Sequence, residues 1–135
     1  MLEIHVVGAA VMDKGKVLAA QRSKDMFPPL KWEFAGGKVE SGETHSQALQ
    51  RELYEELGIK IKVNGFVADG ESEIGKKRIV LHVYEAEIVE GKPVPSEHSE
   101  LRWIEVDRLC ELDWADADIP ACKMLMKRHG SVWCR

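Results

Sequence analysis

Three glutamates at short spacing are the residues of this chain whose arrangement most clearly permits chemistry. Glu52, Glu55 and Glu56 lie in residues 44–57, a segment without an internal Gly or Pro that tolerates a helix throughout. At 100° per residue, the three carboxylates occupy about 100° of one side of such a helix. Like charges at these spacings cost about 0.2–0.5 kcal/mol per pair, whereas a hard divalent cation prefers oxygen ligands. The pattern therefore indicates either a metal site or a solvated acidic face.

The residues around the glutamates predict where this helix begins and ends. Thr44 followed by Gln47 is a capping-box pattern, and Gly58 stands where a left-handed residue usually ends a helix. We therefore predict a helix over Thr44–Leu57 that packs on a core. The apolar face that it buries consists of Ala48, Leu49, Leu53 and Leu57.

The stretch from Gly37 to Ile59 resembles the Nudix box, G-x5-E-x7-R-E-U-x-E-E-x-G-U, where U is a bulky aliphatic residue. The complete match favours the metal site over the solvated face, and the stretch WEFAGGKVE is similar to the MutT-like branch of this family. The resemblance implies a hydrolase of nucleoside diphosphates linked to another group, with Mg²⁺ or Mn²⁺ as cofactor. The fixed positions are occupied by Gly37, Glu43, Arg51, Glu52, Leu53, Glu55, Glu56, Gly58 and Ile59.

The same resemblance implies the fold, an α+β Nudix fold in which an α/β/α sandwich holds a mixed central β-sheet. A length of 135 residues with 44% hydrophobic composition agrees with a single domain over residues 1–135, with the box at 37–59. Asp13–Lys16 is expected to be a hairpin turn, Ala68–Ser72 a loop, and Asp107–Leu112 a short helix or turn. The expected strands are Ile4–Met12, Val17–Gln21, Lys31–Phe34, Lys60–Val67, Arg78–Glu87 (central, because both its faces are largely apolar) and Leu101–Val106.

By resemblance, the metal ions are held by the carbonyl of Gly37 and by side chains of the box and of a later loop. In that loop Glu97 is the expected ligand, and Glu100 is the competing candidate. For the residue that orients or deprotonates the attacking water, Glu52 is the first candidate and Glu97 the second. Arg51 is expected to pair with Glu43 rather than to contact substrate. The expected metal ligands are thus Gly37, Glu52, Glu55, Glu56 and Glu97.

Five further residues are expected to bind the substrate, and most have a structural alternative. Arg22 can be a surface charge at a strand end, Phe34 a core residue, and Arg78 part of a solvated basic turn. Lys38 is placed to meet a phosphate. Asp118 is a good N-cap for a C-terminal helix over Ile119–Arg128, yet it stands where the family can carry an asparagine that reads the base. A carboxylate accepts from an amine of cytosine or adenine and donates only when protonated.

The expected reaction is hydrolysis of a nucleoside triphosphate to the monophosphate and pyrophosphate. Oxidised or modified nucleotides such as 8-oxo-dGTP rank first as substrates, and CTP or dCTP, including 5-methyl-dCTP, is the alternative. The alternative from another class is a catalytically silent nucleotide-binding module. Such modules tend to lose box glutamates, and none is lost here.

The rest of the sequence limits partners and location. The net charge of −4 argues against a nucleic-acid polymer, and no apolar run reaches the ~20 residues that span a membrane. Without a basic, apolar leader, the chain is expected to be cytoplasmic, as a monomer or homodimer. Cys110, Cys122 and Cys134 are far apart and odd in number, which indicates neither a disulfide framework nor a zinc site. The five histidines show no paired ligand spacing and are interpreted as surface or core residues.

Overall fold

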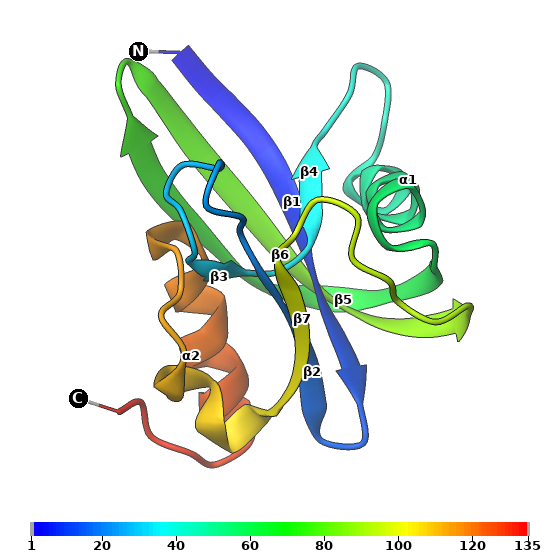
Figure 1. Cartoon of the computed structure of the whole chain (residues 1–135), viewed down its shortest axis with the longest axis vertical. Coiled ribbons are helices and arrows are strands. Elements are labelled where there is room, and N and C mark those ends of the chain that lie inside the picture. The colour runs from blue at the N-terminus through cyan, green and yellow to red at the C-terminus, as the bar shows by residue number, and fades with distance from the viewer. Residues whose placement is uncertain (1, 135) are drawn as a thin grey trace.

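A mixed β-sheet with one helix on each face forms the structure, a computed structural model that describes residues 2–134 (Figure 1). Its elements are β1 (Leu2–Asp13), β2 (Lys16–Gln21), β3 (Trp32–Glu33), β4 (Gly36–Lys38), α1 (His45–Leu57), β5 (Lys60–Ile74), β6 (Lys77–Glu90), β7 (Glu100–Glu105), the 3₁₀ helices η1 (Val106–Glu111) and η2 (Asp116–Asp118), and α2 (Ile119–Arg128). The sheet order is β3-β2-β1-β6-β5, with β4 paired to β1 and β7 paired to β2. Because β1 and β6 are parallel and the other pairs antiparallel, the predicted mixed sheet is confirmed.

The two faces of the sheet bury different hydrophobic clusters. Along β1 the side chains alternate, so that Val7, Ala9 and Val11 pack in the cluster of α1 whereas Ala10 packs in that of α2. Strand β6 lies between β1 and β5, which confirms its predicted central position. The predicted hairpin turn between β1 and β2 is also confirmed, since Asp13 pairs with Lys16.

Strand β5 is longer than the sequence predicts, and the expectation of a loop at Ala68–Ser72 is wrong. Pairing with β6 continues until Ile74 lies opposite Lys77. The segment is polar because β5 is an edge strand, part of which faces water. Gly70 is required here, since an added Cβ would lie 1.8 Å from the carbonyl oxygen of Ala117 in η2.

Helix α1, which carries the three glutamates, begins and ends as predicted. Thr44 Oγ1 accepts from the N–H of Gln47 at 3.1 Å, and Gln47 Oε1 accepts from the N–H of Thr44 at 2.9 Å. Gly58 has a φ of 71°, and its N–H donates to the carbonyl of Tyr54. These local bonds fix the length of the helix independently of its packing.

Arg51 ties the loop before α1 to the helix. Its Nε and Nη2 donate to the two carboxylate oxygens of Glu43 at 2.7 and 2.9 Å, and Nη2 also donates to the carbonyl of Lys38 at 3.0 Å. The predicted pairing of Arg51 with Glu43 is therefore confirmed. The hydrogen bonds from Arg51 and from the N–H of Glu40 lower the pKa of Glu43 to about 2. These hydrogen bonds, here called the Arg51 clamp, fix β4 and the loop before α1 against the helix.

At the C-terminal end, α2 has the predicted bounds, and Pro120 lies in its first turn. The expectation that Asp118 caps this helix through its side chain is wrong. The Asp118 backbone has helical dihedral angles and its side chain makes no capping bond. Its carboxylate instead turns toward β3, where it accepts from the N–H of Phe34.

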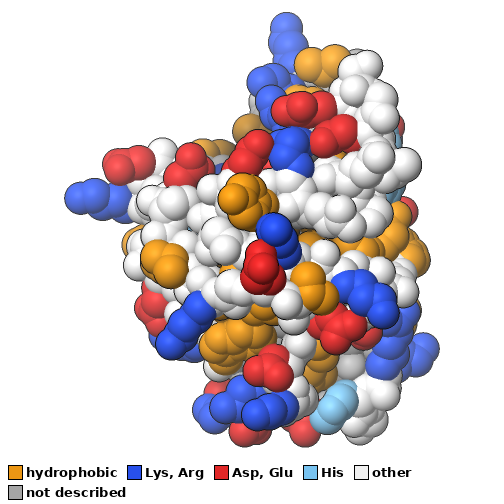
Figure 2. Space-filling model, turned by 90° about the vertical axis from the view of Figure 1, so that its right-hand side faces the viewer, with side chains coloured by type: hydrophobic (Ala, Val, Ile, Leu, Met, Phe, Trp, Pro, Cys, Tyr) orange, Lys and Arg blue, Asp and Glu red, His pale blue; other side chains and the backbone are white. Residues whose placement is uncertain are grey.

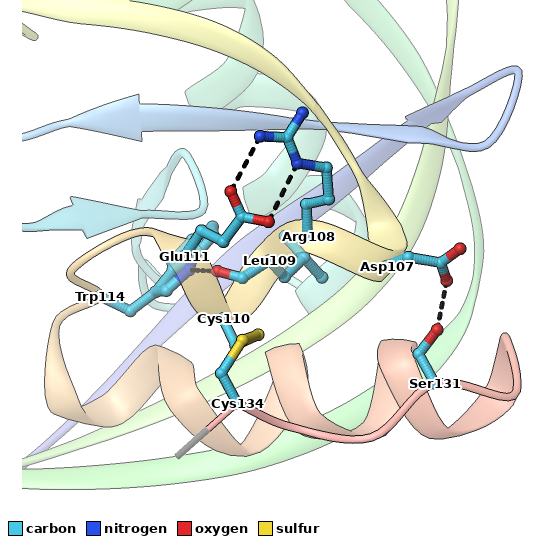
Figure 3. Close-up of a disulfide and its surroundings, with 8 residues drawn as sticks. All are labelled: Asp107, Arg108, Leu109, Cys110, Glu111, Trp114, Ser131 and Cys134. Atoms are coloured by element: carbon cyan, nitrogen blue, oxygen red, sulfur yellow. Dashed lines mark hydrogen bonds and ion pairs between the residues drawn. A yellow bond between two sulfur atoms is a disulfide. The ribbon is translucent and has the colours of Figure 1, made fainter.

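The chain after α2 turns back along η1 and joins it through a disulfide between Cys110 and Cys134 (Figure 3). The sequence indicates no disulfide framework and does not predict this single pair, whose Cα atoms are 5.5 Å apart. Hydrogen bonds from His129 and Ser131 to Asp107 hold the returning tail. Because cytosolic thiols are usually reduced, the disulfide adds no support to the expected cytoplasmic location, which stays a prediction.

The face that carries α1 has mixed charge. Figure 2 shows Lys and Arg side chains interspersed with Asp and Glu over this face, with hydrophobic side chains in separate areas between them. Arg51 illustrates the pattern, since its guanidinium also lies 3.4 Å from the carboxylate of Glu55. Within residues 2–134, no helix combines the length and the hydrophobicity that a membrane crossing needs.

We predict that Glu43→Gln lowers the free energy of unfolding at pH 7, because it removes the charged partner of Arg51. The pKa of Glu43 is lower in the folded chain than its ordinary value of 4.5. The ion pair therefore stabilises the fold above pH 4.5, and this contribution is lost as the pH falls through about 2. Urea unfolding at several pH values measures the difference between variant and wild type.

Glu40→Gln is the matched control, since Glu40 is exposed and its carboxylate is 3.7 Å from Arg51. It is expected to change stability little at any pH. A Glu43→Gln difference that stayed constant from pH 7 to pH 2 would contradict the ion pair as its cause.

Candidate active site

A cavity of about 650 Å³ brings together residues that lie far apart in the sequence, and its size is typical of ligand sites. Its walls are the loop after β2, strands β3 and β4, the hairpin between β5 and β6, the end of α1, the loop before β7, and η2. Six of the residues that the sequence predicts for the site line this one cavity: Arg22, Phe34, Gly37, Glu56, Glu97 and Asp118.

Phe34 and Asp118 form one end of the cavity. Phe34 belongs to the core, where its ring packs on Trp114 with centroids 4.8 Å apart, and it also lines the cavity. Asp118 is only 4% exposed, and its Oδ1 accepts from the N–H of Phe34 at 2.9 Å. Burial raises the pKa of Asp118 well above its ordinary value, and the charge of Glu33 adds to the rise. This environment favours the neutral form of the carboxyl more than water does, and Oδ1 is the oxygen that the N–H of Phe34 uses.

Arg22, Glu33 and His98 form a chain of contacts along the middle of the cavity. Arg22 pairs with Glu33 Oε1 at 2.5 Å and donates to the carbonyls of Phe27 and Pro28, which holds the loop after β2. The second oxygen of Glu33 lies 2.8 Å from His98 Nε2. Burial lowers the pKa of His98, but the hydrogen bond and charge of Glu33 outweigh burial, so that the pKa is raised overall. Sequence analysis missed Glu33 and His98 as cavity residues, because only the fold brings them together.

Gly37 and Glu56 form the other end. A Cβ at Gly37 would lie 2.4–2.6 Å from the carboxyl atoms of Glu52, so that only glycine lets this carboxylate reach β4. Glu56 is half-buried, and its Oε2 is buried without a hydrogen-bond partner among residues 2–134. Burial raises the pKa of Glu56 to about 7, although the charge of His98 opposes the rise. A buried carboxylate oxygen without a partner, beside a second carboxylate, fits a hard divalent cation.

The other predicted metal ligands are close to this end but not gathered into one cluster. Arg51 Nη1 contacts Glu52 at 2.8 Å and Glu55 at 3.4 Å. Accordingly, no three His, Cys, Asp or Glu side chains of residues 2–134 converge closely enough to hold a metal by themselves. Glu97 lines the cavity, whereas the competing Glu100 pairs with Arg102 on β7.

Lys38 and Arg78 do not line the cavity, so that the structure gives their predicted contact with substrate no support. Ile79 and Leu81 of β6 line it, and Arg78 belongs to the alternate set of side chains. Arg78 pairs instead with Glu71 at 2.5 Å. Lys38 is exposed, and its carbonyl is held by Arg51. Side chains alternate between the two faces of a strand, and the sequence does not show which set faces the cavity. This alternation explains why Arg78 lies outside it.

Three histidines that the sequence scatters lie together outside the cavity. The ring of His82 is stacked between those of His5 and His45, with centroids 5.1 and 4.6 Å away. Asp69 contacts His82 and Tyr84 contacts His45. The interpretation of these histidines as surface or core residues holds for each residue but missed their proximity.

Comparison with known proteins gives a consistent result. The family model for the NUDIX domain matches residues 2–123. The CTP pyrophosphohydrolase of Escherichia coli (strain K12) is 40% identical over 126 residues, which are 93% of this chain and 93% of that protein. The 8-oxo-dGTP diphosphatase of the same strain is 31% identical over 121 residues, 90% of this chain and 94% of that protein.

Solved structures agree. The solution structure of the E. coli ORF135 protein superposes with a TM-score of 0.83 at 38% identity, covering 96% of this chain and 92% of that one. A MutT protein from a methicillin-resistant Staphylococcus aureus is 40% identical with a TM-score of 0.78, covering 95% and 99%. With the family model matching most of its length and the box complete, this chain belongs to the Nudix family and is a Nudix hydrolase.

Proposed function

We propose that this Nudix hydrolase is a metal-dependent nucleoside triphosphate pyrophosphohydrolase that prefers cytosine nucleotides. The observation that carries the proposal is the single cavity that joins a pocket at Phe34 and Asp118 to the carboxylates near Gly37. A base that enters the first end directs its phosphates to the second. The proposed reaction releases the monophosphate and pyrophosphate.

At the phosphate end, the residues that would hold Mg²⁺, or Mn²⁺ in its place, are those predicted from the box: the carbonyl of Gly37 with Glu52, Glu55, Glu56 and Glu97. A bound cation of this kind neutralises phosphate charge and lowers the pKa of a bound water. Glu52 is our first candidate to orient or deprotonate the attacking water, because its carboxylate is held against β4, and Glu97 is the second. Arg22 fixes the loop that closes the middle of the cavity.

At the base end, Asp118 favours cytosine. The N–H of Phe34 occupies Oδ1, and burial raises the pKa of the carboxyl; in the proposed protonated form, Oδ2–H would be a donor. Ring nitrogen N3 of cytosine is an acceptor and fits this donor. An oxidised guanine carries an added N–H at position 7, for which an ionised carboxylate would be the acceptor, although its O6 could accept from the protonated form. The proposed preference for cytosine therefore also rests on the 40% identity to a CTP pyrophosphohydrolase.

Oxidised purine nucleotides, which the sequence ranks first, are the second candidate. The observation that favours them is the 31% identity to an 8-oxo-dGTP diphosphatase. An ionised Asp118 would serve this substrate. A catalytically silent module is the least supported alternative, since every box glutamate is present.

The direct test is kcat/KM for CTP, dCTP, 5-methyl-dCTP, dGTP and 8-oxo-dGTP with Mg²⁺, followed by pyrophosphate release. We expect the cytosine nucleotides to lead and EDTA to abolish the reaction. Preference for 8-oxo-dGTP over dGTP and CTP would select the second candidate. Nucleotide binding without any turnover would select the silent module.

Asp118→Asn tests the protonation of the carboxyl. The amide keeps an acceptor for the N–H of Phe34 and presents a donor at the other atom, so that kcat/KM for CTP at pH 7 should stay within about threefold of wild type. As the pH rises, the raised pKa of Asp118 is passed and only wild type loses its donor. The ratio of kcat/KM, wild type over Asp118→Asn, should therefore fall with increasing pH.

The ratio cancels pH effects on chemistry that both enzymes share. Asp118→Ala removes the contact altogether and serves as the reference. We expect its kcat/KM for CTP to be about tenfold lower than that of wild type. A ratio that rose with pH would mean that Asp118 acts as an ionised acceptor.

Glu56→Gln tests the metal site. Loss of a metal ligand should lower kcat/KM by more than the roughly 10–100-fold typical of an outer-shell change. Without metal, the fold should be at least as stable as wild type at pH 8. The pKa of Glu56 rises from an ordinary 4.5 to about 7 on folding, so that wild-type stability falls as the pH rises through this range. The neutral amide avoids that loss.

Thermal unfolding with and without Mg²⁺ measures both effects, and only wild type should be stabilised by the ion. Glu105→Gln, an exposed change on β7, is the control and should behave as wild type. Full activity in Glu56→Gln would show that the metal assignment is wrong.

A further inference from the structure

His98 is a buried polar residue that lines the cavity. Its side chain is 2% exposed, and one ring nitrogen, Nε2, contacts Glu33 at 2.8 Å. The other, Nδ1, is buried without a hydrogen-bond partner among residues 2–134. Buried polar atoms without partners are rare in folded proteins, because they lose their hydration without replacement.

The contact with Glu33 decides what Nδ1 faces. Arg22 donates to the same carboxyl group, so that Glu33 is the acceptor and His98 donates to it through Nε2–H. A single contact of this kind orients the ring and directs Nδ1 to the opposite side. That side is where a partner for His98 must be sought.

Glu56 offers the matching atom. Its Oε2 is the other buried side-chain atom without a partner in residues 2–134, and both residues line the cavity. The loop that carries His98 is tied to Glu56 itself, since Ser96 Oγ donates to the backbone carbonyl of Glu56 at 2.7 Å. On its other side, the N–H of Ser99 donates to the carbonyl of Gln21. These two anchors hold His98 between the end of α1 and β2.

We propose that His98 is a positioning residue that holds the carboxylate of Glu56 through Nδ1, in the orientation that binds the divalent cation. The two atoms are not hydrogen-bonded to each other in the structure. In the proposed arrangement, with the cation bound, one hydrogen bond between them would satisfy both, whichever of them carries the hydrogen. Oε1 of Glu56 is then left for the cation. Through Glu33, the same ring connects this ligand to Arg22 and the loop at the base side of the cavity. The inference rests on the proposed function, because it takes Glu56 as a metal ligand.

Two amide substitutions separate the two ring nitrogens. Asparagine places its amide near the position of Nδ1, whereas glutamine reaches the position of Nε2. His98→Gln keeps the contact with Glu33 and loses the one with Glu56, so that Mn²⁺ affinity should fall by about 10–100-fold. His98→Asn should stay within about threefold of wild type. A residue that only supports Glu33 would give the opposite order.

Mn²⁺ binding is measured by electron paramagnetic resonance of the free ion, with thermal unfolding recorded for each variant. Ser99→Ala is the matched control, since its hydroxyl bonds Gln21 in the same loop. It should leave Mn²⁺ affinity unchanged. Wild-type affinity in His98→Gln, or equal losses in the two His98 variants, would overturn the positioning role. Failure of wild type itself to bind Mn²⁺ would instead refute the metal site of the proposed function, and the inference with it.

If His98→Gln does not fold, ¹⁵N spectra of the imidazole in wild type give the decision. Addition of Mg²⁺ should shift the Nδ1 resonance of His98, because Nδ1 contacts the carboxylate that binds the ion. The resonances of His129, which contacts Asp107 outside the cavity, serve as the internal reference. An unchanged Nδ1 resonance at saturating Mg²⁺ would overturn the inference.

Discussion

The contact between the Glu52 carboxylate and the backbone of Gly37 is the constraint on which the rest of the site depends. Any side chain at residue 37 would overlap the carboxyl group, so that Glu52 keeps this position against β4 only because Cβ is missing. The approach concentrates negative charge, which is unfavourable without compensation. The Arg51 clamp, the capping box and the glycine at the end of α1 serve to hold the helix in this position.

Only some of the carboxylates near the site are paired with a positive charge, and this difference bears on function. Glu43 and Glu52 both contact Arg51, which balances them within the fold. Glu56 is buried with an unpaired oxygen and a raised pKa. A sequence selected for stability alone would not retain such a carboxylate in place of a neutral residue. Burial of Glu56 therefore costs free energy that a bound cation would offset, whereas Glu43 and Glu52 are already paired with Arg51.

Sequence patterns predicted the features that depend on hydrogen bonds and composition within a few residues, such as the ends of the helices. The ends of α1 follow from Thr44, Gln47 and Gly58, and those of α2 from its own composition. The rest depends on partners distant in the chain. Glu33 and His98 are 65 residues apart and become a pair only when the loop before β7 crosses β3. Cys110 and Cys134 meet because the tail reverses, which no spacing rule indicates. The polar end of β5 is a strand because β6 offers it an edge, a tertiary effect that overrides propensity.

Asp118 shows how such a tertiary partner changes chemistry as well as position. As a helix cap it would be partly hydrated and ionised, with both oxygens directed at its own helix. In the fold its backbone enters the helix and its carboxyl reaches β3, where the N–H of Phe34 uses one oxygen and burial disfavours the charge. The same residue thereby has a raised pKa and lies at the wall of the cavity instead of capping its helix. The protonation tendency of this carboxyl group thus follows from its environment in the fold, which its residue type alone does not reveal.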